Sequence, residues 1–144
     1  MREEFGRKFS IDVLGILETK MENITDSIIS SVWGRHDRDW YAVPSLGLSG
    51  GIVCIWNPAS FCVSRCSIAM NEHILHVEGT FTRYNLNCMV SFIYAPIDGI
   101  LKKELWDYLI PSKIVLAPHG ALQVILMKLC HPRIEKVVQK FLLL

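Results

Sequence analysis

The feature that most constrains the fold is the segment Ile11 to Lys20 (IDVLGILETK), in which an apolar run ends abruptly in a carboxylate. The run extends to Leu17, and Glu18 follows directly. This pattern predicts a buried strand that carries one charged side chain to its C-terminal end. Because burying a lone carboxylate costs roughly several kcal/mol, Glu18 is a candidate ligand or acid/base group. The alternative is a carboxylate that already lies in solvent at the rim of the sheet.

Length and composition limit the chain to one ordinary domain. Its 144 residues are 51% hydrophobic and 20% charged, so they can build a core and are not a disordered tail. The 15 Lys and Arg residues nearly balance the 14 Asp and Glu residues, so no net charge favours nucleic acid or acidic lipid. No apolar run reaches the roughly 18 residues of a membrane helix, so we expect no membrane partner.

The cysteines bear on the cellular compartment. Their number, five, is odd, and the opening residues MREEFGRKF are charged where a secretory signal would be apolar. We therefore expect reduced thiols and an intracellular location.

Two cysteines and two histidines form the pattern C-x3-C-x6-H-x2-H: Cys62, Cys66, His73 and His76. Zinc fingers use a longer central spacer and wider histidine spacing. Regular strand alternation would also place both cysteines on one face of a strand. Ordinary core thiols are the favoured interpretation.

Periodicity predicts helices over residues 22–33, ended by Gly34, and over residues 100–109. Four strands are expected over residues 52–56, 61–69, 73–80 and 86–94, and their short connections make the pairing antiparallel. The strand over 86–94 is apolar on both faces, so it should be central in its sheet. Residues 35–40 read as a charged loop.

The loop Pro44 to Gly51 (PSLGLSGG) is rich in turn formers. A phosphate cradle would need a helix to follow the glycines, and here a strand follows. The pattern therefore favours close backbone packing before the strand.

Five stretches in order along the chain resemble a known family. They are LETK at 17–20, a helix with Trp33, Trp40 and Pro44 after it, SGGIVCIWNP at 49–58, YAP at 94–96, and KKELWDYL at 102–109. Together they resemble the endonuclease domain of plant non-LTR retrotransposons, the long interspersed elements. That domain belongs to the endonuclease/exonuclease/phosphatase superfamily, which includes DNase I. The resemblance covers residues 8–110, and residues 111–144 match nothing in the family.

The resemblance implies an α/β (α+β) fold, a four-layer sandwich of two mostly antiparallel sheets with helices outside. It also implies Mg²⁺-dependent cleavage of a DNA phosphodiester, in the nucleus. Glu18 stands where the family has a metal-ligand Glu, and one carboxylate suits a Mg²⁺ that keeps most of its water. Tyr94 stands where the family has an active-site Tyr, and the alternative is an aromatic residue at the rim of the sheet.

The sequence also departs from this family. Family members carry GDFN and a terminal SDH, which orient and activate the attacking water, and neither motif is present. We also expect the sequence to begin after the family's first strand, which bears a metal-site Asn. These departures predict a truncated, catalytically defective endonuclease fragment, because the loss of several catalytic groups removes nearly all activity. The alternative is a non-catalytic interaction fragment that self-associates through exposed apolar surface.

Two structural expectations follow for the remainder of the chain. Residues 111–144 are apolar and interrupted by Pro118 and Pro132, and we expect them to be helical over 121–130 and 133–142. A partial sandwich should also lack the second sheet against which the first packs, which predicts a broad, non-cooperative melt.

Overall fold

The computed structural model describes residues 12–34, 36–94, 98–109, 114–119, 123–129 and 141–143, with side chains up to Leu109. Its elements are β1 (Val13–Leu17), α2 (Asp26–Trp33), β2 (Asp39–Val43), β3 (Ile52–Trp56), β4 (Phe61–Ala69), β5 (Ile74–Phe81), η2 (Thr82–Tyr84), β6 (Leu86–Tyr94), α3 (Gly99–Leu109), β7 (Ile114–His119), β8 (Gln123–Leu129) and β9 (Phe141–Leu143). In this part of the chain, one sheet has the order β2-β3-β1-β9 and the other the order β4-β5-β6-β8-β7. All paired neighbours are antiparallel except β1 and β9.

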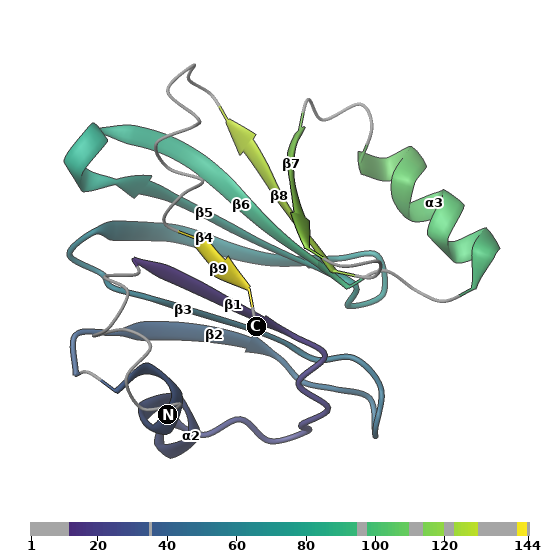
Figure 1. Ribbon diagram of the computed structural model, residues 1–144, viewed down its shortest axis with the longest axis horizontal. Coiled ribbons are helices and arrows are strands. Elements are labelled where there is room, and N and C mark those ends of the chain that lie inside the picture. The colour runs from purple at the N-terminus through teal and green to yellow at the C-terminus, as the bar shows by residue number, and fades with distance from the viewer. Residues whose placement is uncertain are drawn as a thin grey trace.

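The two sheets lie next to each other (Figure 1). Side chains from both build one core between them. The strands contribute alternate residues to it, such as Val13 and Leu17 from β1 and Val90 and Phe92 from β6. The order helix, sheet, sheet, helix confirms the expected α+β sandwich of mostly antiparallel sheets. The expectation that a second sheet would be missing is wrong, because β4, β5 and β6 already supply it from residues 61–94.

Each helix covers the outer face of one sheet. α3 packs Leu105 and Leu109 against Ile74 and Ile93 of β5 and β6. This helix confirms the one expected over residues 100–109. Within the part of the chain that the structure describes, no helix is both long and apolar enough to cross a membrane.

α2 packs against β1 and β3 of the other sheet, with Ile29 and Trp33 buried. Thr25 is its N-cap, and the hydroxyl accepts a hydrogen bond from Ile28 N at 3.4 Å. Gly34 ends the helix in the left-handed conformation with φ 72°. The helix expected over 22–33 is confirmed, but it begins later because the threonine hydroxyl caps it at position 25.

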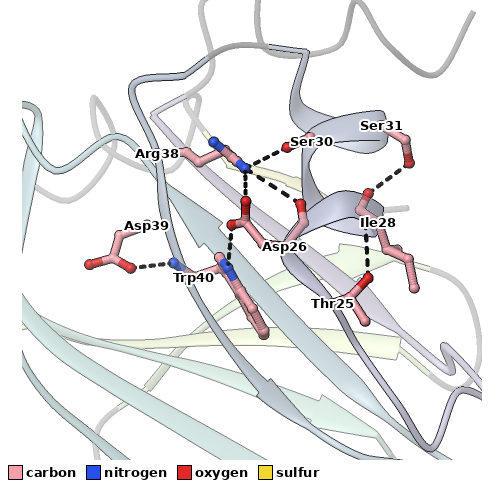
Figure 2. A network of polar contacts seen from close by, with 8 residues as sticks. All are labelled: Thr25, Asp26, Ile28, Ser30, Ser31, Arg38, Asp39 and Trp40. Atoms are coloured by element: carbon pink, nitrogen blue, oxygen red, sulfur yellow. Dashed lines mark hydrogen bonds and ion pairs between the residues drawn. The ribbon is translucent and has the colours of Figure 1, made fainter.

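A polar network fastens α2 to the edge strand β2 (Figure 2). Arg38 Nη2 donates to Asp26 Oδ2 at 2.8 Å and to Ser30 Oγ, and Trp40 Nε1 donates to Asp26 Oδ1 at 3.2 Å. The strand begins at Asp39, inside the segment expected to be a charged loop. That expectation missed β2 because its first residue, Asp39, is charged and exposed at the edge of the sheet.

The strands expected from β3 to β6 are confirmed within a residue at each end, and β6 is the middle strand of its sheet. The helix expected over 121–130 is wrong, because β8 pairs there with β6. An apolar run of this length fits a strand as well as a helix. The strand forms here because it can pair with the edge of β6. The helix expected over 133–142 falls mostly outside the described residues. Pro118 lies in β7, at the sheet edge where proline is tolerated.

Candidate functional site

Glu18 lies at the C-terminal end of β1, where the chain leaves the sheet. Its side chain is half-buried, and its backbone is left-handed with φ 57°. Lys20 repeats this conformation with φ 56°. A left-handed conformation costs a non-glycine residue roughly 1 to 3 kcal/mol and persists only where neighbouring contacts enforce it. Such strain gathers at functional sites, which makes this turn a candidate site.

The glycine-rich loop enforces this turn. Thr19 N donates to Gly51 O at 3.3 Å, and Lys20 N donates to Gly50 O at 2.9 Å. A Cβ atom at Gly51 would lie 2.1 Å from Thr19 Oγ1, so only glycine fits this approach, and its φ of 95° also favours glycine. These contacts confirm the prediction that the glycines serve close backbone packing before a strand.

Tyr94 ends β6 and points its hydroxyl at Glu18. The hydroxyl donates a hydrogen bond to Glu18 Oε1 at 3.2 Å, and the Ser49 side chain also hydrogen-bonds to the phenol. Two residues singled out from the sequence therefore meet, although they come from different sheets. Burial raises the pKa of Tyr94, and the charge of Glu18 and this hydrogen bond raise it further. The phenol is therefore protonated at neutral pH and acts as a donor.

His73 directly precedes β5, the strand beside β6, and packs against Tyr94. The imidazole stacks on the phenol ring, with centroids 5.6 Å apart and planes inclined by 4°. His73 Nδ1 lies 2.8 Å from the Tyr94 carbonyl oxygen. Since a carbonyl oxygen only accepts, Nδ1 carries the proton, and in the neutral ring Nε2 is an acceptor. The stacked ring restricts where the Tyr94 side chain can point.

The cysteine and histidine pattern forms no metal site. A bulge between Val63 and Arg65 shifts the register of β4, so Cys62 is exposed and Cys66 packs against the core between the sheets. The expectation that both cysteines share a face is therefore wrong. His76 Nδ1 lies 2.7 Å from Ser91 Oγ, beneath α3. Within the described residues, no three His, Cys, Asp or Glu side chains gather closely enough to hold a metal ion.

Two arginine side chains make contacts within the fold. The Arg38 side chain is 9% exposed and pairs with Asp26, away from Glu18. Arg83 lies over the ring of Tyr84, 5.7 Å from its centroid. Lys20 is the exposed cation next to Glu18 in the chain.

The donor set meets only the minimum requirement of Mg²⁺. This ion keeps several waters and is commonly held by one or two carboxylates. Glu18 supplies one carboxylate, and the hydroxyls of Tyr94 and Ser49 lie beside it. These residues could hold a hydrated Mg²⁺ weakly through a single oxygen ligand.

Ser49 and His73 are the members of the site that sequence reasoning missed. Ser49 lies inside the glycine-rich loop, which was interpreted from its glycines alone as a site of backbone packing. His73 is brought to Tyr94 by the pairing of β5 with β6, which the local sequence does not encode. Comparison of the chain with protein-family models, curated proteins and solved structures finds no match.

Proposed function

We propose that this chain is a fragment of a Mg²⁺-dependent DNA endonuclease domain of the non-LTR retrotransposon type, and that it retains weak phosphate binding without efficient hydrolysis. One observation supports this proposal. The Tyr94 hydroxyl lies 3.2 Å from Glu18 Oε1, where two strands of opposing sheets end. A carboxylate suits a hard cation, and a protonated phenol suits a phosphate oxygen.

Each residue has a distinct role in this proposal. Glu18 holds the cation, and the Tyr94 hydroxyl turns from Glu18 to donate its one hydrogen bond to a phosphate oxygen. His73 keeps the phenol ring in place by stacking on it. A bound Mg²⁺ would polarise the phosphoryl group. The 144 residues carry neither GDFN nor SDH, the motifs that supply the water-activating Asp and His in that family, and we therefore expect hydrolysis to be lost.

Binding of DNA tests the retained function. We expect a fluorescently labelled duplex to bind weakly, with an affinity that rises when Mg²⁺ is added. Glu18→Gln should remove most of the Mg²⁺ dependence, because it removes the anionic ligand. Glu22→Gln is the matched control, since Glu22 is an exposed acid four positions along the same loop. Equal Mg²⁺ dependence in the two variants would contradict the proposal.

Nicking of a supercoiled plasmid tests the lost function. We expect no Mg²⁺-dependent nicking by folded protein. Nicking that disappears with both EDTA and Glu18→Gln would show that hydrolysis persists in a smaller site and would overturn that part of the proposal.

A second candidate is a non-catalytic interaction fragment, and one observation favours it. Leu46 and Leu48 are 73% and 86% exposed on a tight turn in which Leu46 and Ser49 exchange backbone hydrogen bonds of 3.0 and 3.2 Å. Two rigid, exposed leucines can drive self-association. Sedimentation of the chain beside a Leu46→Ser, Leu48→Ser double variant tests this alternative, which predicts that only the unchanged chain associates.

A further inference from the structure

A pocket of about 580 Å³ lies between β1, the turn that follows it, and α2. Its main walls are formed by Ile16, Glu18, Met21, Ile24, Ile28 and Val32. A volume of roughly 300 to 1,000 Å³ is typical of sites that bind small molecules.

The walls are apolar side chains that the fold leaves half-covered. Ile16, Ile24 and Val32 pack on one side against the buried cluster beneath α2, yet each remains partly exposed. Ile28 and Met21 are also partly exposed. Removing this surface from water is favourable, so an apolar body that fills the pocket would gain affinity from each wall.

The charge at the pocket has one sign. Among the described residues that line it, Glu18 is the only charged one, and the polar ones are Thr19 and Ser31. Neither Lys20 nor Arg38 is part of the lining. A carboxylate can accept several hydrogen bonds, so the bond from Tyr94 to Oε1 leaves capacity for a further donor. An anionic ligand would meet repulsion here, and a cation would be attracted.

We propose that this pocket binds a small amphiphilic amine, whose alkyl or aryl body lies against the isoleucines of β1 and α2 and whose ammonium group pairs with Glu18. The apolar walls distinguish this ligand from a hydrated metal ion, which would gain nothing from them. The Glu18 carboxylate favours an amine over a fatty acid, which it would repel, and over a neutral lipid, which carries no charge to pair with it. This site shares Glu18 with the endonuclease proposal, but it needs no DNA and no metal, so the two proposals can fail separately.

Titration of the isotope-labelled chain in EDTA, followed by NMR, tests the ligand class. We expect octylamine to shift amide signals in residues 16–21 and in α2. Octanoate should bind at least fivefold more weakly, and octanol should fall between the two. Removing one methylene group from the amine should weaken binding by roughly fourfold. Octanoate that binds as tightly as octylamine would overturn the proposal.

Two pairs of variants test the site itself. Glu18→Gln should weaken octylamine by about threefold to fivefold without changing octanol, whereas Glu22→Gln should change neither. Ile28→Asn should weaken both ligands, because it places an amide in the apolar wall. Ser27→Asn introduces the same side chain at an exposed position of the same helix and should have no effect.

Thermal melts of all four variants separate loss of binding from loss of fold. A folded Ile28→Asn variant that binds octylamine normally, or a Glu18→Gln variant that keeps the full preference for amine over octanoate, would refute the proposed pocket.

Discussion

The hydroxyl of Tyr94 donates a hydrogen bond to Glu18 Oε1 at 3.2 Å, although the two residues are 76 positions apart in the chain. Glu18 directly follows β1, and Tyr94 is the last residue of β6. These two strands belong to opposing sheets and contact each other across the core. The bond therefore joins the two layers at one edge of the sandwich. Because the hydrogen bond is only partly buried, a ligand can reach the two side chains.

Replacing Tyr94 by Phe should lower the free energy of unfolding by about 1 kcal/mol, because the variant loses one hydrogen bond to a partly exposed carboxylate. Urea denaturation followed by tryptophan fluorescence measures this change. Tyr41→Phe is the control, since Tyr41 is exposed on the edge strand β2. A loss of stability no larger in Tyr94→Phe than in Tyr41→Phe would show that the bond contributes nothing.

Stability should fall at high pH partly because of Tyr94. Burial, the charge of Glu18 and the hydrogen bond raise the pKa of this phenol in the folded chain, whereas the unfolded chain titrates near a pKa of about 10. Between these two pKa values the folded state keeps a proton that the unfolded state has lost, so the free energy of unfolding decreases as pH rises. The contribution of Tyr94 is thus complete below a pH of about 10 and is lost above it.

Two variants isolate this contribution from the titration of other groups. Tyr94→Phe should lose less stability than the unchanged chain when the pH is raised through this range. Glu18→Gln should lower the pKa of Tyr94 toward its ordinary value, which absorbance of the tyrosinate measures. An unchanged titration in Glu18→Gln would rule out Glu18 as a cause of the raised pKa.

Gly51→Ala should destabilise the fold by about 2 to 4 kcal/mol. The new Cβ would meet Thr19 Oγ1 at 2.1 Å in a backbone conformation with φ 95°. Gly47→Ala is the matched control, because Gly47 has φ 62° and nothing within 4 Å of its Cβ position, and it should cost about 1 kcal/mol. The denaturant concentration at the midpoint of unfolding, measured for both variants, compares their stability.

A second substitution separates the two causes at Gly51. Thr19→Ala removes the hydroxyl that the new Cβ meets, so it should recover part of the stability lost in Gly51→Ala. The backbone strain would remain. No recovery in the double variant would place the whole cost in the backbone conformation.

A chain that ends at residue 110 should melt at a lower temperature and aggregate. It would lack β8, which pairs with β6 over Cys88–Tyr94, and the open edge of β6 would be free to pair with other chains. A chain that ends at residue 130 keeps β8 and removes β9, and it should aggregate less. Circular dichroism with light scattering measures both effects.

The 144-residue chain should instead melt cooperatively, because side chains of both sheets share one core. A broad melt was expected from the sequence, on the assumption that only one sheet would form. Equal melting temperatures for the 144-residue chain and the chain ending at residue 110 would show that the C-terminal strands add no stability.

Local pattern was sufficient for much of the fold. Alternation along Leu86–Tyr94 predicted a central strand with two covered faces, and Gly34 predicted the end of α2. β2 was missed because its first residue, Asp39, is charged and exposed, like the loop residues before it. The strand β8 was mistaken for a helix because its apolar run has no distinguishing period.

Some residues of the candidate site could be found in the sequence, but their contacts could not. Glu18 could be singled out because a carboxylate after a buried run is visible in the sequence, and Tyr94 because the family resemblance implies an active-site tyrosine at that position. Their contact, the stacking of His73 and the apolar pocket beneath Ile28 could not be read from the chain.

The α+β class was expected from the family resemblance. The sequence by itself determined most strand positions and the residues that carry charge or hydroxyl groups at strand ends, because hydrophobic periodicity and turn residues act over a few positions. Only the tertiary structure decided which of those ends meet. Sheet packing and the bulge in β4 bring together or separate residues that are distant in the chain, and no local pattern specifies these long-range contacts.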